Sequence, residues 1–269
     1  MTLREVRKKL DESGLENSAE EARILFSHFS AIPINELYGT NPSCENAELE
    51  EAVQRRCENY PLQYITGYVD FYRERYEVND GCLIPRSDTE ILVEKAINTL
   101  PHGAKFIDLC TGSGCVAISV LANRADLTAV AVDISDDAIS LAKSNALRNN
   151  VGDRITFEKC NILSDSFSPA PDAEYILSNP PYIPSGDICT LQAEVLYEPR
   201  IALDGGSDGM VFYRNILSRF GNAPTIKSFI FEIGYDLGEK IKKESERLGL
   251  KCDITKDLSG LDRVAYITR

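Results

Sequence analysis

The stretch Phe106-Ile107-Asp108-Leu109-Cys110-Thr111-Gly112-Ser113-Gly114 decides how this 269-residue chain is expected to fold. Its first four residues have the apolar character of a buried strand. The glycines that follow permit a tight turn, and an apolar helical pattern begins at Cys115. A strand, a glycine-rich loop and a helix in this order predict a ligand-binding turn, in which the free amides of the helix N-terminus face the ligand.

Further short strands and helices alternate beyond this loop. The predicted strands are Ala129–Val132, Ile155–Phe157, Tyr175–Leu177 and Phe229–Glu232. Helical patterns are predicted over Ala138–Leu147 and at Met210, Tyr213, Leu217 and Phe220. This alternation predicts an α/β fold with a mostly parallel, Rossmann-like sheet and helices on both faces. Two last runs, Lys251–Thr255 and Val264–Thr268, flank Ser259-Gly260 and predict an antiparallel edge.

Two acidic residues at predicted strand ends bear on the ligand. Asp133 follows the strand Ala129–Val132, where a carboxylate can accept both ribose hydroxyls of an adenosine. The spacing Gly112-x-Gly114-x-x-Ala117 also satisfies the dinucleotide fingerprint, so the loop alone leaves NAD and S-adenosylmethionine both open. Asp108 favours S-adenosylmethionine, because its charge would repel a pyrophosphate and would suit a cationic sulfonium ligand.

The tetrapeptide Asn179-Pro180-Pro181-Tyr182 directly follows the strand Tyr175–Leu177. Two consecutive prolines fix two φ angles and remove two hydrogen-bond donors, which leaves a rigid, acceptor-rich segment. The Asn179 side-chain oxygen and the Pro180 carbonyl can grip both N–H bonds of an amide group, and Tyr182 can pack on its plane. Methyl transfer to such a nitrogen then needs mainly alignment and complementary electrostatics.

The N-terminal part of the chain has the pattern of helices without alternating strands. Residues 1–75 are predicted to form a small helical domain that docks the substrate, 76–86 a hairpin linker, and 87–269 the catalytic domain. Capping-box patterns at Thr2-x-x-Glu5, Ser18-x-x-Glu21 and Ser87-x-x-Glu90 each predict the start of a helix. Ala22, Leu25, Phe26 and Phe29 follow helical spacing and predict one buried stripe.

Composition restricts the classes of partner. The formal net charge is −13 and the pI is about 4.7, which argues against direct binding to nucleic acid. The eight cysteines and two histidines do not have the spacing of a metal site, so no metal is expected. No apolar run is long enough to span a membrane and no signal-peptide pattern opens the chain, so we expect a cytoplasmic protein.

Taken together, these motifs resemble those of the PrmC/HemK family, the glutamine-N5 methyltransferases of peptide chain release factors. The stretches that resemble the family, besides the glycine loop, Asp133 and Asn179–Tyr182, are Pro61–Gly67, Leu83–Glu90, Glu198–Gly206 and Leu258–Val264. The resemblance covers nearly the whole chain from about Pro61. It implies S-adenosylmethionine as the cofactor, S-adenosylhomocysteine as its product, and the glutamine of the release factor's Gly-Gly-Gln loop as the methyl acceptor.

The resemblance also implies roles for particular residues. The cofactor-binding set would be Asp108, Leu109, Cys110, Thr111, Gly112, Gly114, Asp133, Ile162 and Asn179. The glutamine would be held by Asn179, Pro180, Pro181 and Tyr182, of which Asn179, Pro180 and Tyr182 would be catalytic. The family usually has Arg-Pro-Glu-Thr-Glu where this chain has Arg86-Ser-Asp-Thr-Glu90, and an acidic residue where this chain has Asn161-Ile162.

Rival functions differ in what they would require. A DNA adenine-N6 methyltransferase also uses Asn-Pro-Pro-Tyr, but it needs a target-recognition domain and a basic groove, and a ribosomal-RNA guanine-N2 methyltransferase meets the same objection. An NAD-dependent dehydrogenase explains the glycine loop and leaves Asn179–Tyr182 without a role. A non-catalytic binding module would not bind S-adenosylmethionine.

Overall fold

The computed structural model describes residues 1–165, 167 and 173–269. The described chain divides into two compact units. The first consists of Met1–Tyr68 with Gln192–Tyr197, and the second of Val69–Leu191 with Glu198–Arg269. A short segment from the middle of the sequence thus packs with the N-terminal helices.

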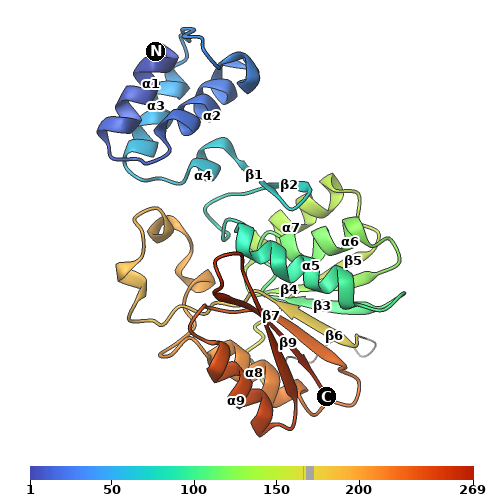
Figure 1. The fold of residues 1–269 in the computed structure, drawn as a ribbon. Coiled ribbons are helices and arrows are strands. Elements are labelled where there is room, and N and C mark those ends of the chain that lie inside the picture. The colour runs from blue at the N-terminus through green and yellow to red at the C-terminus, as the bar shows by residue number, and fades with distance from the viewer. Residues whose placement is uncertain (166, 168–172) are drawn as a thin grey trace. The chain divides into compact units, whose positions relative to one another are not determined.

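The first unit is helical (Figure 1). Its helices are α1 (Leu3–Glu12), α2 (Ser18–Ser30), the 3₁₀ turn η1 (Ile34–Glu36), α3 (Ala47–Cys57) and α4 (Leu62–Thr66). Thr2 caps α1 as predicted, since its hydroxyl accepts from the Glu5 amide and the Glu5 carboxylate accepts from the Thr2 amide at 2.7 Å. The predicted stripe on α2 is confirmed, because Ala22, Leu25 and Phe26 are buried and Phe29 packs against the same core.

The second unit begins with a two-stranded hairpin and continues as an α/β fold. The hairpin strands are β1 (Tyr68–Phe71) and β2 (Glu74–Glu77), so the hairpin turns at Tyr72-Arg73. The helices of this unit are η2 (Ser87–Thr89), α5 (Glu90–Thr99), α6 (Cys115–Asn123), α7 (Asp136–Arg148), η3 (Ile188–Thr190), η5 (Arg200–Ala202), α8 (Val211–Phe220) and α9 (Gly238–Arg247). The 3₁₀ turn η4 (Val195–Tyr197) belongs to the first unit. The strands are β3 (Lys105–Leu109), β4 (Thr128–Asp133), β5 (Ile155–Lys159), β6 (Tyr175–Ser178), β7 (Ser228–Glu232), β8 (Lys251–Lys256) and β9 (Asp262–Thr268).

These seven strands form one sheet with the order β5-β4-β3-β6-β7-β9-β8. The five strands from β5 to β7 are parallel, and β9 is antiparallel to both β7 and β8. The predicted antiparallel element is present, with β9 inside the sheet and β8 at its edge. The chain leaves β3 toward β4 on one side and returns to β6 on the other, so the strand order reverses at β3 and a crevice forms beyond the strand ends.

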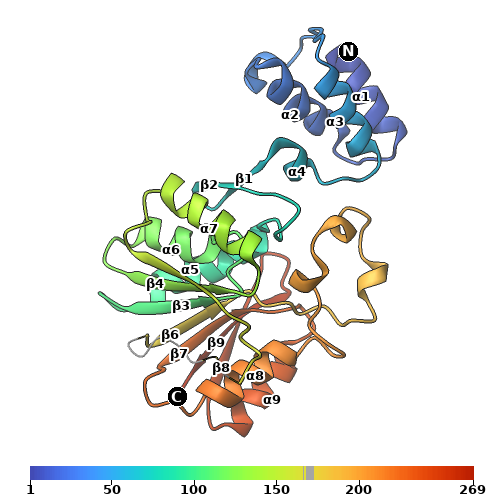
Figure 2. The same cartoon turned by 180° about the vertical axis from the view of Figure 1, so that it is seen from behind.

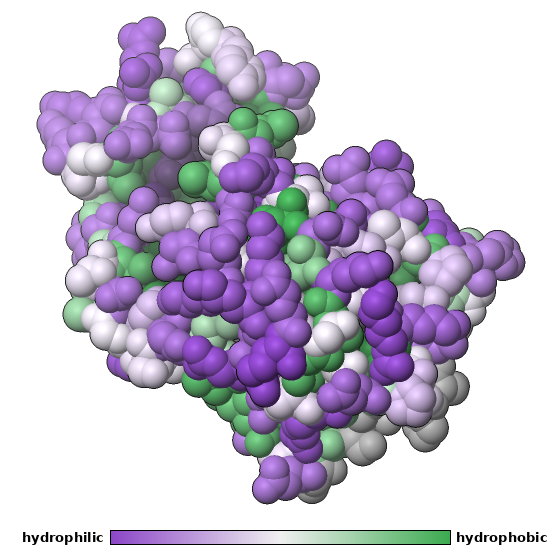
Figure 3. Space-filling model, turned by 60° about the horizontal axis from the view of Figure 1, so that its bottom comes forward, coloured by the Kyte–Doolittle hydropathy of each residue, from purple (hydrophilic) through white to green (hydrophobic). Residues whose placement is uncertain are grey.

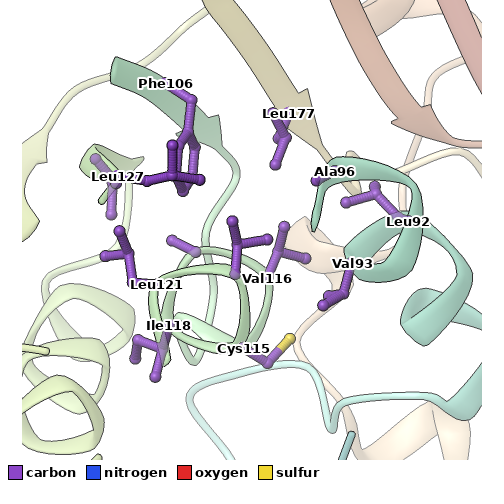
Figure 4. Close-up of a cluster of buried hydrophobic side chains, with 14 of the residues drawn as sticks. Leu92, Val93, Ala96, Phe106, Cys115, Val116, Ile118, Leu121, Leu127 and Leu177 are labelled. Atoms are coloured by element: carbon purple, nitrogen blue, oxygen red, sulfur yellow. The ribbon is translucent and has the colours of Figure 1, made fainter. Parts of the chain in front are cut away.

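Alternate side chains of each strand pack on opposite faces of the sheet. Phe106 and Leu177 pack with residues of α5 and α6 in one core, part of which Figure 4 shows. Ile107 and Ile176 pack with α8 and α9 in the other. Figures 1 and 2 show α5, α6 and α7 covering one face of the sheet and α8 and α9 covering the other, as predicted.

Figure 3 shows a face of the molecule on which hydrophilic residues dominate and hydrophobic ones form small separate groups. Within the described part of the chain, no helix is both long enough and apolar enough to cross a membrane.

Candidate active site

A cavity of about 220 Å³ lies at the carboxyl ends of the parallel strands. It is lined by the loops after β3, β4, β5 and β6, and by the segments around residues 81–89 and 199–202. Of the predicted site residues, seven line it: Cys110, Thr111, Gly112, Asp133, Ile162, Asn179 and Pro181. The others, Asp108, Leu109, Gly114, Pro180 and Tyr182, are not among the residues that line it.

The glycine loop is held in a fixed shape by its own backbone. The Thr111 amide donates to the Val132 carbonyl at 3.0 Å, and the Gly114 amide donates to the Thr111 carbonyl at 2.8 Å. Gly114 has a φ of 83°, and a Cβ there would lie 2.7 Å from Ile118 Cδ1. Glycine at this position therefore lets α6 begin directly after the turn, beside α7.

Asp108 lies beneath the loop and away from the cavity surface. Its carboxylate is 1% exposed, and Oδ2 accepts from the Thr111 hydroxyl at 2.6 Å and from the Ala117 amide at 3.3 Å. Burial raises the pKa of Asp108 to about 7, although these hydrogen bonds oppose the shift. Oδ1 is buried without a hydrogen-bond partner among the described residues. The carboxyl thus joins the loop to the first turn of α6 and keeps one acceptor position open.

Replacing Asp108 by asparagine should alter how stability depends on pH. The unfolded chain titrates near 3.8 and the folded protein near 7, so the folded state binds the proton more tightly. The contribution of Asp108 to the free energy of unfolding of the wild type therefore falls as pH rises from about 4 to about 7. Asp108→Asn removes this loss. At the upper end of this pH range its free energy of unfolding should exceed that of the wild type by roughly 4 kcal/mol at most. Thermal unfolding from pH 4 to 8 measures this difference, and a constant offset across that range would contradict it.

Asp133 is the acidic residue that faces the cavity. Its Oδ2 accepts from the Gly112 amide at 2.9 Å and its Oδ1 accepts from the Ser135 amide at 3.0 Å. Each oxygen keeps a further lone pair for a ligand, while the two amides fix the plane of the carboxylate. The charged residues in the cavity lining are Asp133 and Arg86.

The cavity lining includes apolar residues from the loops after β4 and β5 and from α7, namely Ile134, Ala138, Ile162 and Leu163. The loop after β5 is held there by Arg219 of α8, whose guanidinium donates to the carbonyls of Ile162 at 2.9 Å, Ser164 at 2.7 Å and Phe167 at 3.0 Å. Sequence reasoning missed Arg219, because a single arginine on an amphipathic helix carries no motif.

The Asn179–Tyr182 segment is fixed from several sides. The Ser178 hydroxyl donates to the Leu109 carbonyl at 2.6 Å, and Asn179 Nδ2 donates to Thr89 Oγ1 at 3.2 Å. The Tyr182 hydroxyl donates to Glu232 Oε1 at 3.3 Å, and burial raises the Tyr182 pKa above its ordinary value. A Cβ at Gly209 would lie 2.3 Å from the Tyr182 carbonyl oxygen, so only glycine allows this close approach.

The segment Glu198–Gly206 contributes Pro199, Ile201 and Ala202 to the cavity lining. Glu198 is buried, and its carboxylate accepts from the Ile84 amide at 3.1 Å and pairs with Arg86. Pro85 and Arg86 line the cavity together with Pro199, Ile201 and Ala202. Glu198 thereby ties the segment around Leu83–Glu90 to the segment that begins with Glu198 itself.

The sheet order, the glycine loop and the acidic strand end at one cavity define a Rossmann-like methyltransferase. Comparisons with known proteins agree. The Methyltransferase small domain family matches residues 87–215, and the PrmC N-terminal domain family matches residues 2–67. In structure, the crystal structure of the hMettl16 catalytic domain in complex with MAT2A 3′UTR hairpin 6 has a TM-score of 0.58 at 16% identity and is similar in fold, over 86% of this chain and 85% of that one.

Relatives in sequence narrow the class to one family. The release factor glutamine methyltransferase of Geobacter sulfurreducens is 38% identical over 95% of this chain and 91% of its own length. That of Thermodesulfovibrio yellowstonii is 33% identical over 93% of this chain and 92% of its own length. The chain belongs to the release factor glutamine methyltransferase family, which confirms the resemblance seen in the sequence.

Proposed function

We propose that this protein transfers a methyl group from S-adenosylmethionine to the side-chain amide nitrogen of a glutamine in a peptide chain release factor. The observation that carries the proposal is that Asn179 and Pro181 line the same cavity as Gly112 and Asp133. The segment that we assign to the amide and the loop that we assign to the adenosine therefore line one cavity. The glutamine of the Gly-Gly-Gln loop is the acceptor that we assign to it.

The residues of the cavity fit the cofactor in chemistry. Asp133 would accept the ribose hydroxyls, and Ile134, Ala138, Ile162 and Leu163 would hold the adenine between apolar side chains. Asp108 offers a buried, unpartnered carboxyl oxygen beneath the loop, which suits a cationic ligand. When bound, S-adenosylmethionine supplies an electrophilic methyl group on a positively charged sulfur.

The acceptor side is arranged to orient an amide. An amide nitrogen is a poor nucleophile, because its lone pair is delocalised into the carbonyl. Asn179 Nδ2 is engaged by Thr89, so Oδ1 is the end of the side chain left for a substrate N–H. We assign the second N–H to the Pro180 carbonyl, and a packing role to Tyr182, whose ring is held through its hydroxyl. Orientation of this kind lowers the entropic part of the barrier.

We assign docking of the release factor to the first unit. In that unit the segment Gln192–Tyr197 packs on α3. Arg56 pairs with Glu194 at 3.0 Å, and the Tyr197 hydroxyl donates to the Glu58 carbonyl at 3.0 Å. The helices and this segment together would form the surface for the protein substrate.

The direct test is transfer of labelled methyl from S-adenosylmethionine to purified release factors, with the modified peptide mapped by mass spectrometry. A release factor whose Gly-Gly-Gln glutamine is replaced by glutamate is the matched control. Duplex DNA and ribosomal RNA serve as competing acceptors in the same assay. Label in nucleic acid, or none at the glutamine, would overturn the proposal.

Binding of S-adenosylhomocysteine and of NADH distinguishes a methyltransferase from an NAD-dependent dehydrogenase. S-adenosylhomocysteine should bind saturably and inhibit transfer, whereas NADH should show no saturable binding. The physical reason is that the Asp108 carboxyl beneath the loop, to the extent that it is ionised above its pKa of about 7, opposes a pyrophosphate there. Isothermal titration of each ligand measures the difference, and micromolar NADH affinity without an effect of S-adenosylhomocysteine would reverse the assignment.

A further inference from the structure

Asn161 is a polar residue of the cavity lining, and it follows the end of β5 by two residues. In the sheet β5 lies beside β4, and the Cys160 amide donates to the Asp133 carbonyl at 2.8 Å. Asn161 therefore comes directly after the strand end next to the carboxylate that we assign to the ribose. The two residues after it, Ile162 and Leu163, belong to the apolar lining that we assign to the adenine.

The side-chain amide of Asn161 is held with its donor end available. Its Oδ1 accepts from the Leu163 amide at 2.9 Å. A backbone N–H can only donate, so this contact fixes which end of the side chain is the oxygen. Within the described part of the chain, Asn161 Nδ2 has no hydrogen-bond partner. Because the oxygen is engaged by the backbone of its own loop, the NH₂ group is the end left for a ligand.

The loop that carries Asn161 is fixed by hydrogen bonds of its own. The Ser164 amide donates to the Asn161 carbonyl at 2.9 Å. Arg219 of α8 donates to the carbonyls of Ile162 at 2.9 Å and Ser164 at 2.7 Å. These contacts do not depend on a ligand, so Asn161 loses little freedom when one binds. Preorganisation of this kind lowers the cost of binding and lets a single hydrogen bond contribute to selectivity.

Adenine presents two kinds of polar group at its edges. Its ring nitrogens N1, N3 and N7 are acceptors, because each has a lone pair in the plane of the base. Its exocyclic amino group is a donor, since the lone pair of that nitrogen is delocalised into the ring. Two donors cannot pair, so the NH₂ group of Asn161 can bind a ring nitrogen of adenine but not its amino group.

We propose that Asn161 is a specificity-determining residue, which recognises adenine through a hydrogen bond from Nδ2 to one of the ring nitrogens. The inference deepens the proposed function and rests on it, since it requires the cavity to take the adenosine part of S-adenosylmethionine. The apolar lining alone would hold the base without selecting among its edges, and Asn161 supplies that selection. A ligand with C–H in place of the bound nitrogen leaves the NH₂ group unpaired and binds more weakly.

The test is a double-mutant cycle between Asn161 and the base, measured by isothermal titration. S-adenosylhomocysteine is compared with three analogues in which N1, N3 or N7 is replaced by C–H, at a pH at which all four bases are neutral. One analogue should bind the wild type about three- to tenfold more weakly. Asn161→Asp keeps the size and an oxygen for the Leu163 amide, but replaces the NH₂ group by an acceptor. It should bind S-adenosylhomocysteine about tenfold more weakly or worse, and the penalty for that one analogue should vanish or reverse.

Asn150→Asp is the matched control, because it adds the same charge at an exposed residue just after α7 that does not line the cavity. It should change S-adenosylhomocysteine affinity by less than about twofold. In methyl transfer, Asn161→Asp should raise KM for S-adenosylmethionine and leave kcat close to wild type.

Two results would overturn the inference. One is a folded Asn161→Asp variant that binds S-adenosylhomocysteine as tightly as the wild type or more tightly, since the carboxylate would then accept from the amino group of adenine. The other is the same penalty in both proteins for each of the three analogues. A wild type that does not bind S-adenosylhomocysteine would instead overturn the proposed function.

Discussion

Replacing Asn179 by alanine is expected to lower the rate of methyl transfer by about 10²-fold or more and to leave cofactor affinity nearly unchanged. Asn179 follows β6, whereas the glycine loop follows β3, so the side chain serves the acceptor side of the cavity. Its Oδ1 is one of the two acceptors that we assign to the target amide. Loss of one preorganised contact of this kind costs about 2.7–4 kcal/mol in the transition state.

Single-turnover transfer to a release factor, together with titration of S-adenosylhomocysteine, measures both quantities. Asn179→Asp is the sharper variant, because it keeps the size and an acceptor oxygen but loses the donor to Thr89. If the acceptor alone matters, aspartate should retain more activity than alanine. Equal failure would mean that the Nδ2 contact with Thr89 is also needed. Near-normal transfer by the alanine variant would remove Asn179 from the mechanism.

The arrangement of the sheet followed from the sequence because its signals are local. Each strand is a short apolar run, and each helix repeats apolar residues at helical spacing. The ends of parallel strands meet at one edge, so the glycine loop, Asp133 and Asn179 could be brought to one cavity without a structure. The position of β9 inside the sheet was not available in the same way, since strand order depends on pairing between distant segments.

Asp108 was expected to contact the ligand, and the structure places it beneath the loop. Side chains alternate along a strand, so Asp108 shares its face with Phe106, toward α6, and not with Ile107 and Leu109. Its carboxyl accordingly accepts from the Ala117 amide in that helix. The alternation was present in the sequence and would have predicted a buried carboxyl at this position.

Helices begin at Ser18 and Ser87 as the capping-box patterns predicted, but the capping hydrogen bonds themselves do not form at these two places. Ser18 donates to Asp11 and Glu21 pairs with Arg56, while the Glu90 carboxylate accepts from the Tyr72 amide at 2.8 Å. Each side chain has a partner from outside its own helix, which outweighs the local cap. The contacts of Arg219 and Glu232 are of the same long-range kind. Sequence patterns report local preference, and such partners are decided by tertiary packing.

Replacing Asp133 by alanine should weaken S-adenosylmethionine binding by about 1.5–3 kcal/mol, the range for hydrogen bonds to a charged group. This corresponds to a Kd roughly 10- to 150-fold higher. The carboxylate would lose its contacts to the ribose, and the Gly112 amide would lose the acceptor at 2.9 Å that holds the loop. Asp133→Asn keeps one oxygen, so its Kd for S-adenosylmethionine should lie between those of the wild type and of Asp133→Ala.

Asp136→Ala is the matched control for this variant. Asp136 lies three residues further on, is exposed, pairs with Lys159 and does not line the cavity. Asp136→Ala removes a negative charge close to the one that Asp133→Ala removes. If only Asp133→Ala weakens binding, long-range electrostatics cannot be the cause. Isothermal titration of S-adenosylmethionine and S-adenosylhomocysteine should give parallel losses for Asp133→Ala, because the ribose is common to both. Unchanged affinity in that variant would remove Asp133 from the cofactor site and would reopen the choice of ligand for the glycine loop.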